Sequence, residues 1–249
     1  CGQDEKDPNH IKVGVIVGAE QQVAEVAQKV AKEKYGLDVE LVTFNDYVLP
    51  NEALSKGDID VNAFQHKPYL DQQIKDRGYK LVAVGNTFVY PIAGYSKKIK
   101  SLDELQPGSQ IAVPNDPTNL GRSLLLLQQV GLIKLKDGVG LLPTSLDIVE
   151  NPKNLKIVEL EAPQLPRSLD DAQIALAVIN TTYASQIGLT PAKDGIFVEG
   201  KESPYVNLIV AREDNKDAEN VKKFVQAYQS DEVYEAANKI FNGGAVKGW

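Results

Sequence analysis

A strand-to-helix junction near the middle of the chain carries the side chains best suited to binding a small ligand. Residues 110–113 have the pattern of a buried strand, Asp116 is a good helix N-cap, and Pro117 suits the first helical position. Free N–H groups at such a helix start favour an anion. Asn119 and Arg122 share one helix face, and Arg122 can grip a carboxylate through two parallel hydrogen bonds. A solvated helix face is the alternative for Arg122, but the leucine run that follows favours a buried helix.

Ring side chains form a second group of candidate binding residues. They come from the ends of predicted strands and from turns, where rings can wall an apolar pocket. The group consists of Phe64, His66, Tyr69, Phe88 and Tyr90. For each ring the alternative is that it closes a hydrophobic core, and His66 can equally be a structural histidine.

Two asparagines complete the candidate site. Asn180 follows the apolar strand pattern at 174–179, and Asn207 lies in a later segment next to Pro and Tyr. An amide offers both a donor and an acceptor, which suits the charged ends of an amino acid without burying another charge. Asparagines also cap turns, so a purely structural role is the alternative.

Other chemistries lack their sequence patterns. The chain has two histidines and no Gly-x-Ser-x-Gly turn, so a nucleophile with a histidine base is not indicated. Gly14 and Gly18 do not form a dinucleotide-binding motif, and Glu20 would repel a phosphate there. No grouping of residues has metal-ligand spacing. We therefore expect a protein that is not an enzyme and that holds no metal and no cofactor.

The composition restricts the class of protein and its partners. The 249 residues include 43% hydrophobic and 24% charged residues, which is typical of a folded globular chain. The net charge is 27 − 34 = −7, which argues against nucleic acid as a partner. The single cysteine, Cys1, precludes an internal disulfide and is followed by a polar stretch. We expect residues 1–10 to form a flexible tether that carries a lipid on Cys1, with a free thiol as the alternative.

Strands and helices alternate along most of the chain. Strand patterns occupy 11–17, 38–44, 59–64, 80–84, 92–96, 110–113, 155–160, 174–179 and 206–211. Helical patterns occupy 23–35, 68–77, 101–105, 117–130, 145–150 and 181–188, and two more lie near the C-terminal end. A strand, a helix and a strand at the start of the chain predict a parallel α/β unit.

Two Pro- and Tyr-containing segments, 87–91 and 202–207, have the character of crossings between lobes. A chain that leaves a lobe and later returns to it forms two α/β lobes with a ligand cleft between them. We predict that lobe 1 comprises residues 11–90 and 206–249, and that lobe 2 comprises residues 91–205.

Several motifs resemble those of a known family, the NlpA lipoproteins, and the resemblance extends over essentially the whole chain. The motifs are Ile11-Lys-Val-Gly-Val, Asn62-Ala-Phe-Gln-His66, Gly85-Asn-Thr-Phe88, Pro114-Asn-Asp-Pro-Thr-Asn-Leu-Gly-Arg122 and Phe241-Asn-Gly-Gly-Ala-Val-Lys-Gly-Trp249. The resemblance implies a periplasmic-binding-protein fold of type II. It also implies a substrate-binding lipoprotein of a bacterial ABC importer for methionine, anchored on the periplasmic side of a membrane through a lipid on Cys1. The implied partners are methionine, the permease and its ATPase subunit.

The resemblance also implies roles for individual residues. Arg122 would bind the ligand carboxylate, and Asn180 and Asn207 would hold the amino and carboxyl groups. The five ring residues would line a thioether pocket. Three alternatives stay open at this point: a receptor for methionine-containing dipeptides, an enzyme acting on amino acids, and a chaperone or adhesin that uses its outer surface.

Overall fold

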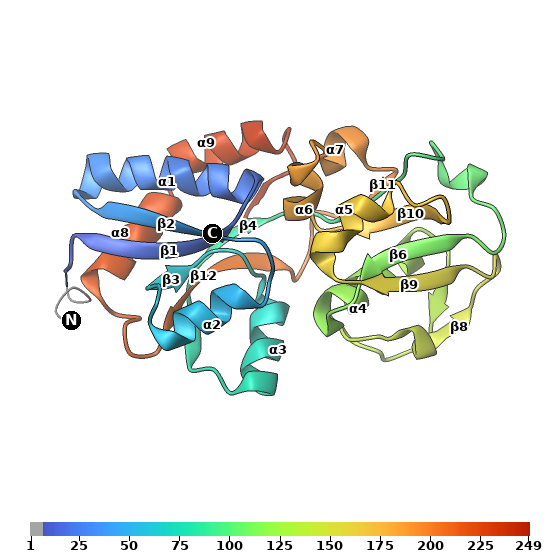
Figure 1. Cartoon of the computed structure of the whole chain (residues 1–249), viewed down its shortest axis with the longest axis horizontal. Helices are drawn as coiled ribbons and strands as arrows, with labels where there is room; N and C mark the ends of the chain where they lie inside the picture. Colours follow the sequence, from blue (N-terminus) through green and yellow to red (C-terminus); the bar gives the residue numbers. More distant parts are fainter. Residues whose placement is uncertain (1–6) are drawn as a thin grey trace. The chain divides into compact units, whose positions relative to one another are not determined.

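The structure is a computed structural model that describes residues 7–249, and the chain divides into two compact units. Unit 1 contains the described residues up to Tyr90 together with Lys201–Trp249, and unit 2 contains Pro91–Gly200. Each unit has its own sheet and its own helices (Figure 1). The predicted lipid attachment point, Cys1, lies outside the described residues.

Unit 1 is built on a mixed six-stranded sheet. In spatial order its strands are β13 (Val246–Lys247), β4 (Leu81–Val89), β12 (Val206–Arg212), β3 (Val61–Asn62), β1 (His10–Ile16) and β2 (Asp38–Phe44). Strand β1 pairs in parallel with β2 and β3, whereas β12 runs antiparallel to β3 and β4. The parallel pairing of β1 with β2 confirms the α/β unit predicted at the start of the chain.

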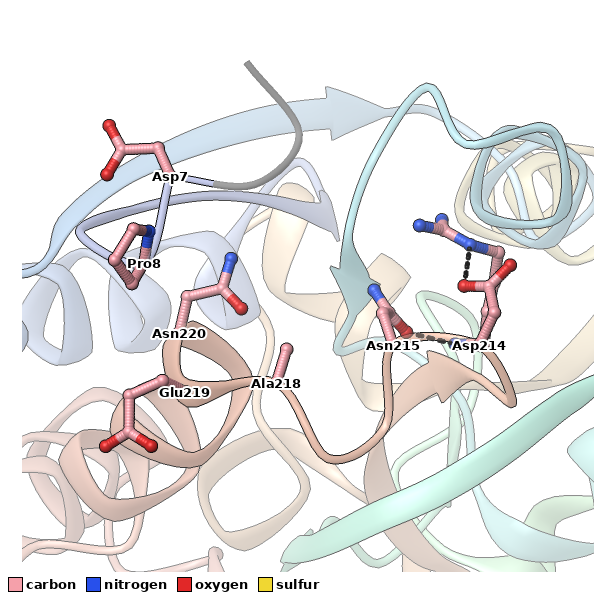
Figure 2. Close-up of a pocket in the computed structure, with 8 residues that line it drawn as sticks. Asp7, Pro8, Asp214, Asn215, Ala218, Glu219 and Asn220 are labelled. Carbon is pink, nitrogen blue, oxygen red and sulfur yellow. Dashed lines mark hydrogen bonds and ion pairs between the residues drawn. The ribbon is translucent and has the colours of Figure 1, made fainter. Parts of the chain in front are cut away.

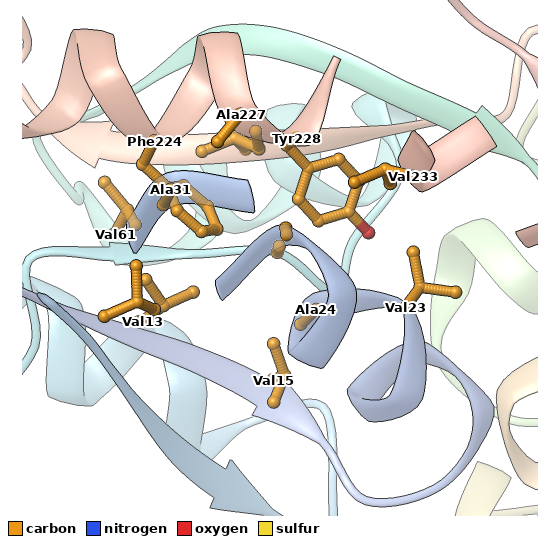
Figure 3. Close-up of a cluster of buried hydrophobic side chains, with 14 of the residues drawn as sticks. Val13, Val15, Val23, Ala24, Ala31, Val61, Phe224, Ala227, Tyr228 and Val233 are labelled. Carbon is orange, nitrogen blue, oxygen red and sulfur yellow. The ribbon is translucent and has the colours of Figure 1, made fainter. Parts of the chain in front are cut away.

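Helices cover both faces of this sheet (Figure 1). They are α1 (Ala19–Tyr35), α8 (Glu219–Tyr228) and α9 (Asp231–Ile240) on one face, and α2 (Leu49–Lys56) and α3 (Lys67–Arg77) on the other. Successive side chains of a strand point to opposite faces of the sheet, so apolar strands supply both faces with apolar side chains. Val13 and Val15 of β1 pack in the cluster that includes Phe224 of α8 (Figure 3), while Leu208 and Val210 of β12 pack with Leu54 of α2.

Unit 2 has a five-stranded sheet. In spatial order its strands are β11 (Phe197–Val198), β5 (Ala93–Tyr95), β10 (Ile174–Ile179), β6 (Gln110–Pro114) and β9 (Lys156–Leu160). Its α-helices are α4 (Pro117–Gln129), α5 (Leu165–Ser168), α6 (Thr181–Gln186) and α7 (Pro191–Asp194), and its 3-10 turns are η2 (Leu102–Glu104) and η4 (Ala162–Gln164). The leucines of α4 pack on β6 and β10, so the helix that carries Arg122 is fixed by the core of this unit.

The helix predicted at 145–150 is wrong. The segment forms a single 3-10 turn, η3 (Ser145–Asp147), and continues as strand β8 (Ile148–Glu150). Thr144 and Asp147 form a capping box around that turn, and β8 pairs antiparallel with β7 (Lys134–Leu135). Pairing with a strand ten or more residues away therefore decides the conformation, which local helical spacing cannot reveal.

Helix α1 is the longest helix of the described chain, with 17 residues. Within residues 7–249, no helix combines the length and the apolar character that a membrane span requires.

Candidate functional site

The start of α4 is built as the sequence predicts. Asp116 is the N-cap, its carboxylate accepts a hydrogen bond of 3.1 Å from the Asn119 N–H, and Pro117 takes the first helical position. Asp116 also accepts a hydrogen bond from the Thr118 hydroxyl at 3.1 Å. These contacts fix the first turn of α4 at the carboxyl end of β6, and Asn119 and Arg122 lie on that turn and the next.

Arg122 is a buried arginine held by a carboxylate. Its residue is 4% exposed, so the solvated helix face, which was the alternative, does not apply. Its Nε donates to Glu199 Oε2 at 3.0 Å, and its Nη2 donates to Glu199 Oε1 at 2.6 Å. The two parallel bonds use the fork geometry that makes arginine selective for carboxylates. The sequence analysis did not select Glu199, because it lies 77 residues from Arg122.

Asn180 joins this group from the end of β10. Its Nδ2 donates to Asn119 Oδ1 at 3.3 Å, and its own Oδ1 is buried and has no hydrogen-bond partner among the described residues. A buried acceptor without a donor is costly, and a ligand ammonium or amide would satisfy it. Three of the predicted site residues therefore come together in unit 2: Asn119, Arg122 and Asn180.

The carboxyl group of Asp116 has a perturbed pKa. Burial raises it above the ordinary value of 3.8, and the hydrogen bonds from Asn119 and Thr118 oppose the rise. Because the folded-state pKa is raised, this group contributes stability below pH 3.8, and the contribution is lost as the pH rises through the folded-state pKa. At neutral pH, therefore, the charge on Asp116 lowers stability while its hydrogen bonds add to it.

We expect the variants Asp116→Asn and Asp116→Ala to separate these two effects. Asn removes the partly buried charge but still caps the helix, so the free energy of unfolding at pH 7 should be unchanged or higher by up to about 1 kcal/mol. Ala removes the cap and should lower it by about 1 kcal/mol. Urea unfolding at pH 7 measures both, and an equal loss in the two variants would show that the charge is favourable. At a pH below 3.8, Asn should give no gain.

The predicted ring residues of unit 1 fall into two groups, of which the first surrounds His66. His66 caps α3, because its Nδ1 accepts from the Tyr69 N–H at 3.1 Å. Phe64 and Tyr69 meet edge to face with ring centroids 6.0 Å apart. Two further tyrosines that the sequence analysis did not select complete the group. Tyr47 lies 5.9 Å from Phe64, and Tyr205 lies 5.0 Å from His66.

The second group, Phe88 and Tyr90, belongs to the hydrophobic core of unit 1. Phe88 is fully buried and its ring centroid lies 5.1 Å from that of Trp249. Tyr90 packs against Phe241 with centroids 4.4 Å apart. Closing the core was the alternative interpretation for these two rings, and they have this role in the structure. Their role as ligand contacts stays a prediction.

Asn207 lies beside His66 and a buried carboxylate. Its backbone forms an antiparallel bridge with His66, and its Nδ2 donates to Glu20 Oε2 at 3.4 Å. Glu20 is 4% exposed. Burial is the main cause that raises the pKa of Tyr228, and the negative charge of Glu20 is the second. Sequence analysis did not select Glu20 as a ligand residue, although it lies in the first turn of the helix that follows β1, the same kind of junction that carries Arg122 in unit 2.

A polar pocket of about 450 Å³ lies elsewhere on unit 1 (Figure 2). Asp7 and Pro8 contribute to it just before β1, and Asp214 and Glu219 contribute after β12. It therefore lies at the amino end of β1, whereas small ligands of parallel sheets bind outside the carboxyl ends. Its Arg212 is bonded to Asp214 at 3.0 Å, and Asp7 and Glu219 add two further carboxylates to the lining. Over the described part of the chain, no three His, Cys, Asp or Glu side chains are grouped for a metal ion.

Solved structures define the class to which this fold belongs. A periplasmic substrate-binding protein of an ABC transporter from Coxiella burnetii is 51% identical, with a TM-score of 0.92 over 96% of this chain and 100% of that one. A nutrient binding protein from Burkholderia cenocepacia, solved bound to methionine, is 55% identical, with a TM-score of 0.92 over 96% of this chain and 100% of that one. The two α/β units are therefore the two lobes of a periplasmic substrate-binding protein.

The family follows from the sequence itself. The family model described as NlpA lipoprotein matches residues 11–249, and the chain belongs to this family. The D-methionine-binding lipoprotein MetQ of Escherichia coli (strain K12) is 96% identical over 249 residues, which is 100% of this chain and 92% of that relative. These matches confirm the family and the fold class that the motifs predict.

Proposed function

We propose that this protein is the substrate-binding lipoprotein of a bacterial ABC importer and that its ligand is methionine. The observation that carries the proposal is the buried group in unit 2. There Glu199 fixes the guanidinium of Arg122, which can bind a carboxylate, and Asn180 offers a buried acceptor. A free amino acid presents the matching pair, a carboxylate and an ammonium. The methionine-bound relative and the D-methionine-binding relative support the choice of side chain.

The ring group of unit 1 supports a thioether ligand. The ring centroids of Phe64, Tyr69 and Tyr47 lie 5.8–6.0 Å apart, and the rings meet at tilted or edge-on angles. Ring edges of this kind make favourable contacts with a thioether sulfur. In unit 2, Arg122 is the residue that we assign to the ligand carboxylate.

Calorimetry on ligand-free protein tests the proposal. The protein is unfolded in denaturant, dialysed, refolded and titrated with L-methionine, D-methionine and glycyl-methionine, with L-leucine as the matched control. We expect saturable heat and a higher melting temperature with methionine, because a ligand that binds only the folded state stabilises it. No heat and no thermal shift with either enantiomer would refute the proposal. Tighter binding of glycyl-methionine would assign the dipeptide instead.

The relatives are named as binding proteins, which agrees with a receptor rather than an enzyme. We further propose that a lipid on Cys1 anchors the protein on the periplasmic side of a membrane and that it delivers methionine to a permease driven by an ATPase subunit. Mass spectrometry of the intact protein from bacterial membranes tests the anchor. A mass equal to that of the bare polypeptide would contradict it.

A further inference from the structure

Glu199 is the last side chain of unit 2 before the chain crosses back at Gly200, and it binds Arg122 through both carboxylate oxygens. The Arg122 side chain is 5% exposed and the Glu199 side chain 11%. A buried ion pair of this geometry needs both partners, because removal of either one leaves the other charge without compensation. Glu199 is therefore part of the environment that any ligand of Arg122 meets.

The backbone of Glu199 is also fixed. Its N–H donates to the Ile92 carbonyl at 2.8 Å, and the Ile92 N–H donates to Glu199 Oε1 at 3.4 Å. Ile92 follows directly on Pro91, where the chain first enters unit 2. The carboxylate is thus held by a second segment of the same unit, and it cannot follow a ligand away from Arg122 without breaking those bonds.

This arrangement determines how Arg122 can meet a ligand. The edge formed by Nε and Nη2 is committed to Glu199. A ligand carboxylate cannot take that same edge while Glu199 holds it, since a guanidinium presents its donors in a rigid planar fork.

The charges around Arg122 determine which net charge a ligand can bring without an energetic cost. Arg122 and Glu199 together carry no net charge, and Asp116 at the start of the same helix is another carboxylate. A ligand with a carboxylate and no ammonium would add one uncompensated negative charge to a buried group, which is costly. A zwitterion brings its own positive charge and leaves the balance unchanged.

We propose that Glu199 is a positioning residue for Arg122 and that, by neutralising it, Glu199 makes the protein select a zwitterionic amino acid over the corresponding monoanionic acid. This inference rests on the proposed methionine site. It predicts that the loss of the Glu199 charge shifts preference toward the acid without an α-amino group, because the negative charge that repels a second carboxylate at Arg122 is then gone.

The test compares two ligands that differ only in the ammonium group. L-methionine and 4-(methylsulfanyl)butanoate are titrated by displacement calorimetry into wild-type protein, Glu199→Gln, Glu199→Asp and the control Glu202→Gln. Glu202 is exposed and lies three residues away, so its replacement changes the net charge equally. The ratio measured is the Kd of 4-(methylsulfanyl)butanoate divided by the Kd of L-methionine. We expect this ratio to fall roughly tenfold or more in Glu199→Gln. It should stay within about threefold of wild type in Glu199→Asp and Glu202→Gln.

The outcomes separate a positioning role from a purely structural one. Equal weakening of both ligands in Glu199→Gln, or an unchanged ratio, would overturn the inference. Circular dichroism establishes whether each variant is folded. Because Glu199→Asp keeps the charge, a roughly tenfold fall of the ratio in that variant would also overturn the inference. Absence of methionine binding by the wild-type protein would refute the proposed function instead.

Discussion

Replacement of Arg122 by Ala is expected to weaken methionine binding by about 3 kcal/mol or more, which is roughly a hundredfold or more in Kd. The side chain is buried, so the bound carboxylate would lose its charged partner in a place where water cannot replace it. Calorimetry measures the change. Arg167→Ala is the matched control, because Arg167 lies on the same unit and is exposed. The affinity of this variant for methionine should not change.

The same variant should also be less stable, because Glu199 would remain buried without its partner. We expect a loss of about 3 kcal/mol in the free energy of unfolding. The double variant Arg122→Ala with Glu199→Gln removes the unpaired charge, so it should recover part of the stability and none of the affinity. Wild-type affinity in Arg122→Ala would take Arg122 out of the ligand site.

Replacement of Asn62 by Ala is expected to lower the free energy of unfolding by about 2–4 kcal/mol. Asn62, Asn51 and Gln65 form a closed network of buried amides, with side-chain hydrogen bonds of 2.8–3.1 Å. Asn62 Nδ2 also donates to the Pro50 carbonyl at 3.1 Å. Removing one amide leaves buried donors and acceptors of the other two without partners.

Urea unfolding followed by circular dichroism measures this effect. Asn238→Ala is the control, because Asn238 is exposed on α9 and its loss should change the free energy by less than about 0.5 kcal/mol. We also expect weaker methionine binding by Asn62→Ala, since the network holds the segment that carries Phe64 and His66. A change in stability no larger than that of the control would show that water replaces the lost amide.

Local patterns in the sequence were sufficient for the elements whose conformation depends on near neighbours. Strands β1 and β2 show the expected apolar pattern, and α1 shows helical spacing between them. The cap at Asp116 with Pro117 behind it is confirmed because a cap is settled within four residues. The helix predicted at 145–150 failed because strand pairing with Lys134–Leu135 overrides local spacing. Helix α2 was not predicted at all.

The partners of the candidate site residues depend on long-range contacts. Arg122 and Glu199 are 77 residues apart, and Asn207 and Glu20 are 187 apart, so no local pattern relates them. Phe88 and Tyr90 could be selected by residue type, but only packing against Trp249 and Phe241 places them in a core.

The sequence by itself determined the family, the two-lobed α/β class and the residue types of the candidate site, because motifs, periodicity and caps are properties of neighbouring residues. Only the tertiary structure decided that Arg122 is already bonded to a carboxylate and that Asn180 has a buried acceptor. The physical reason is that burial and charge compensation arise when distant segments meet, and their energies depend on distances that residue order alone does not contain.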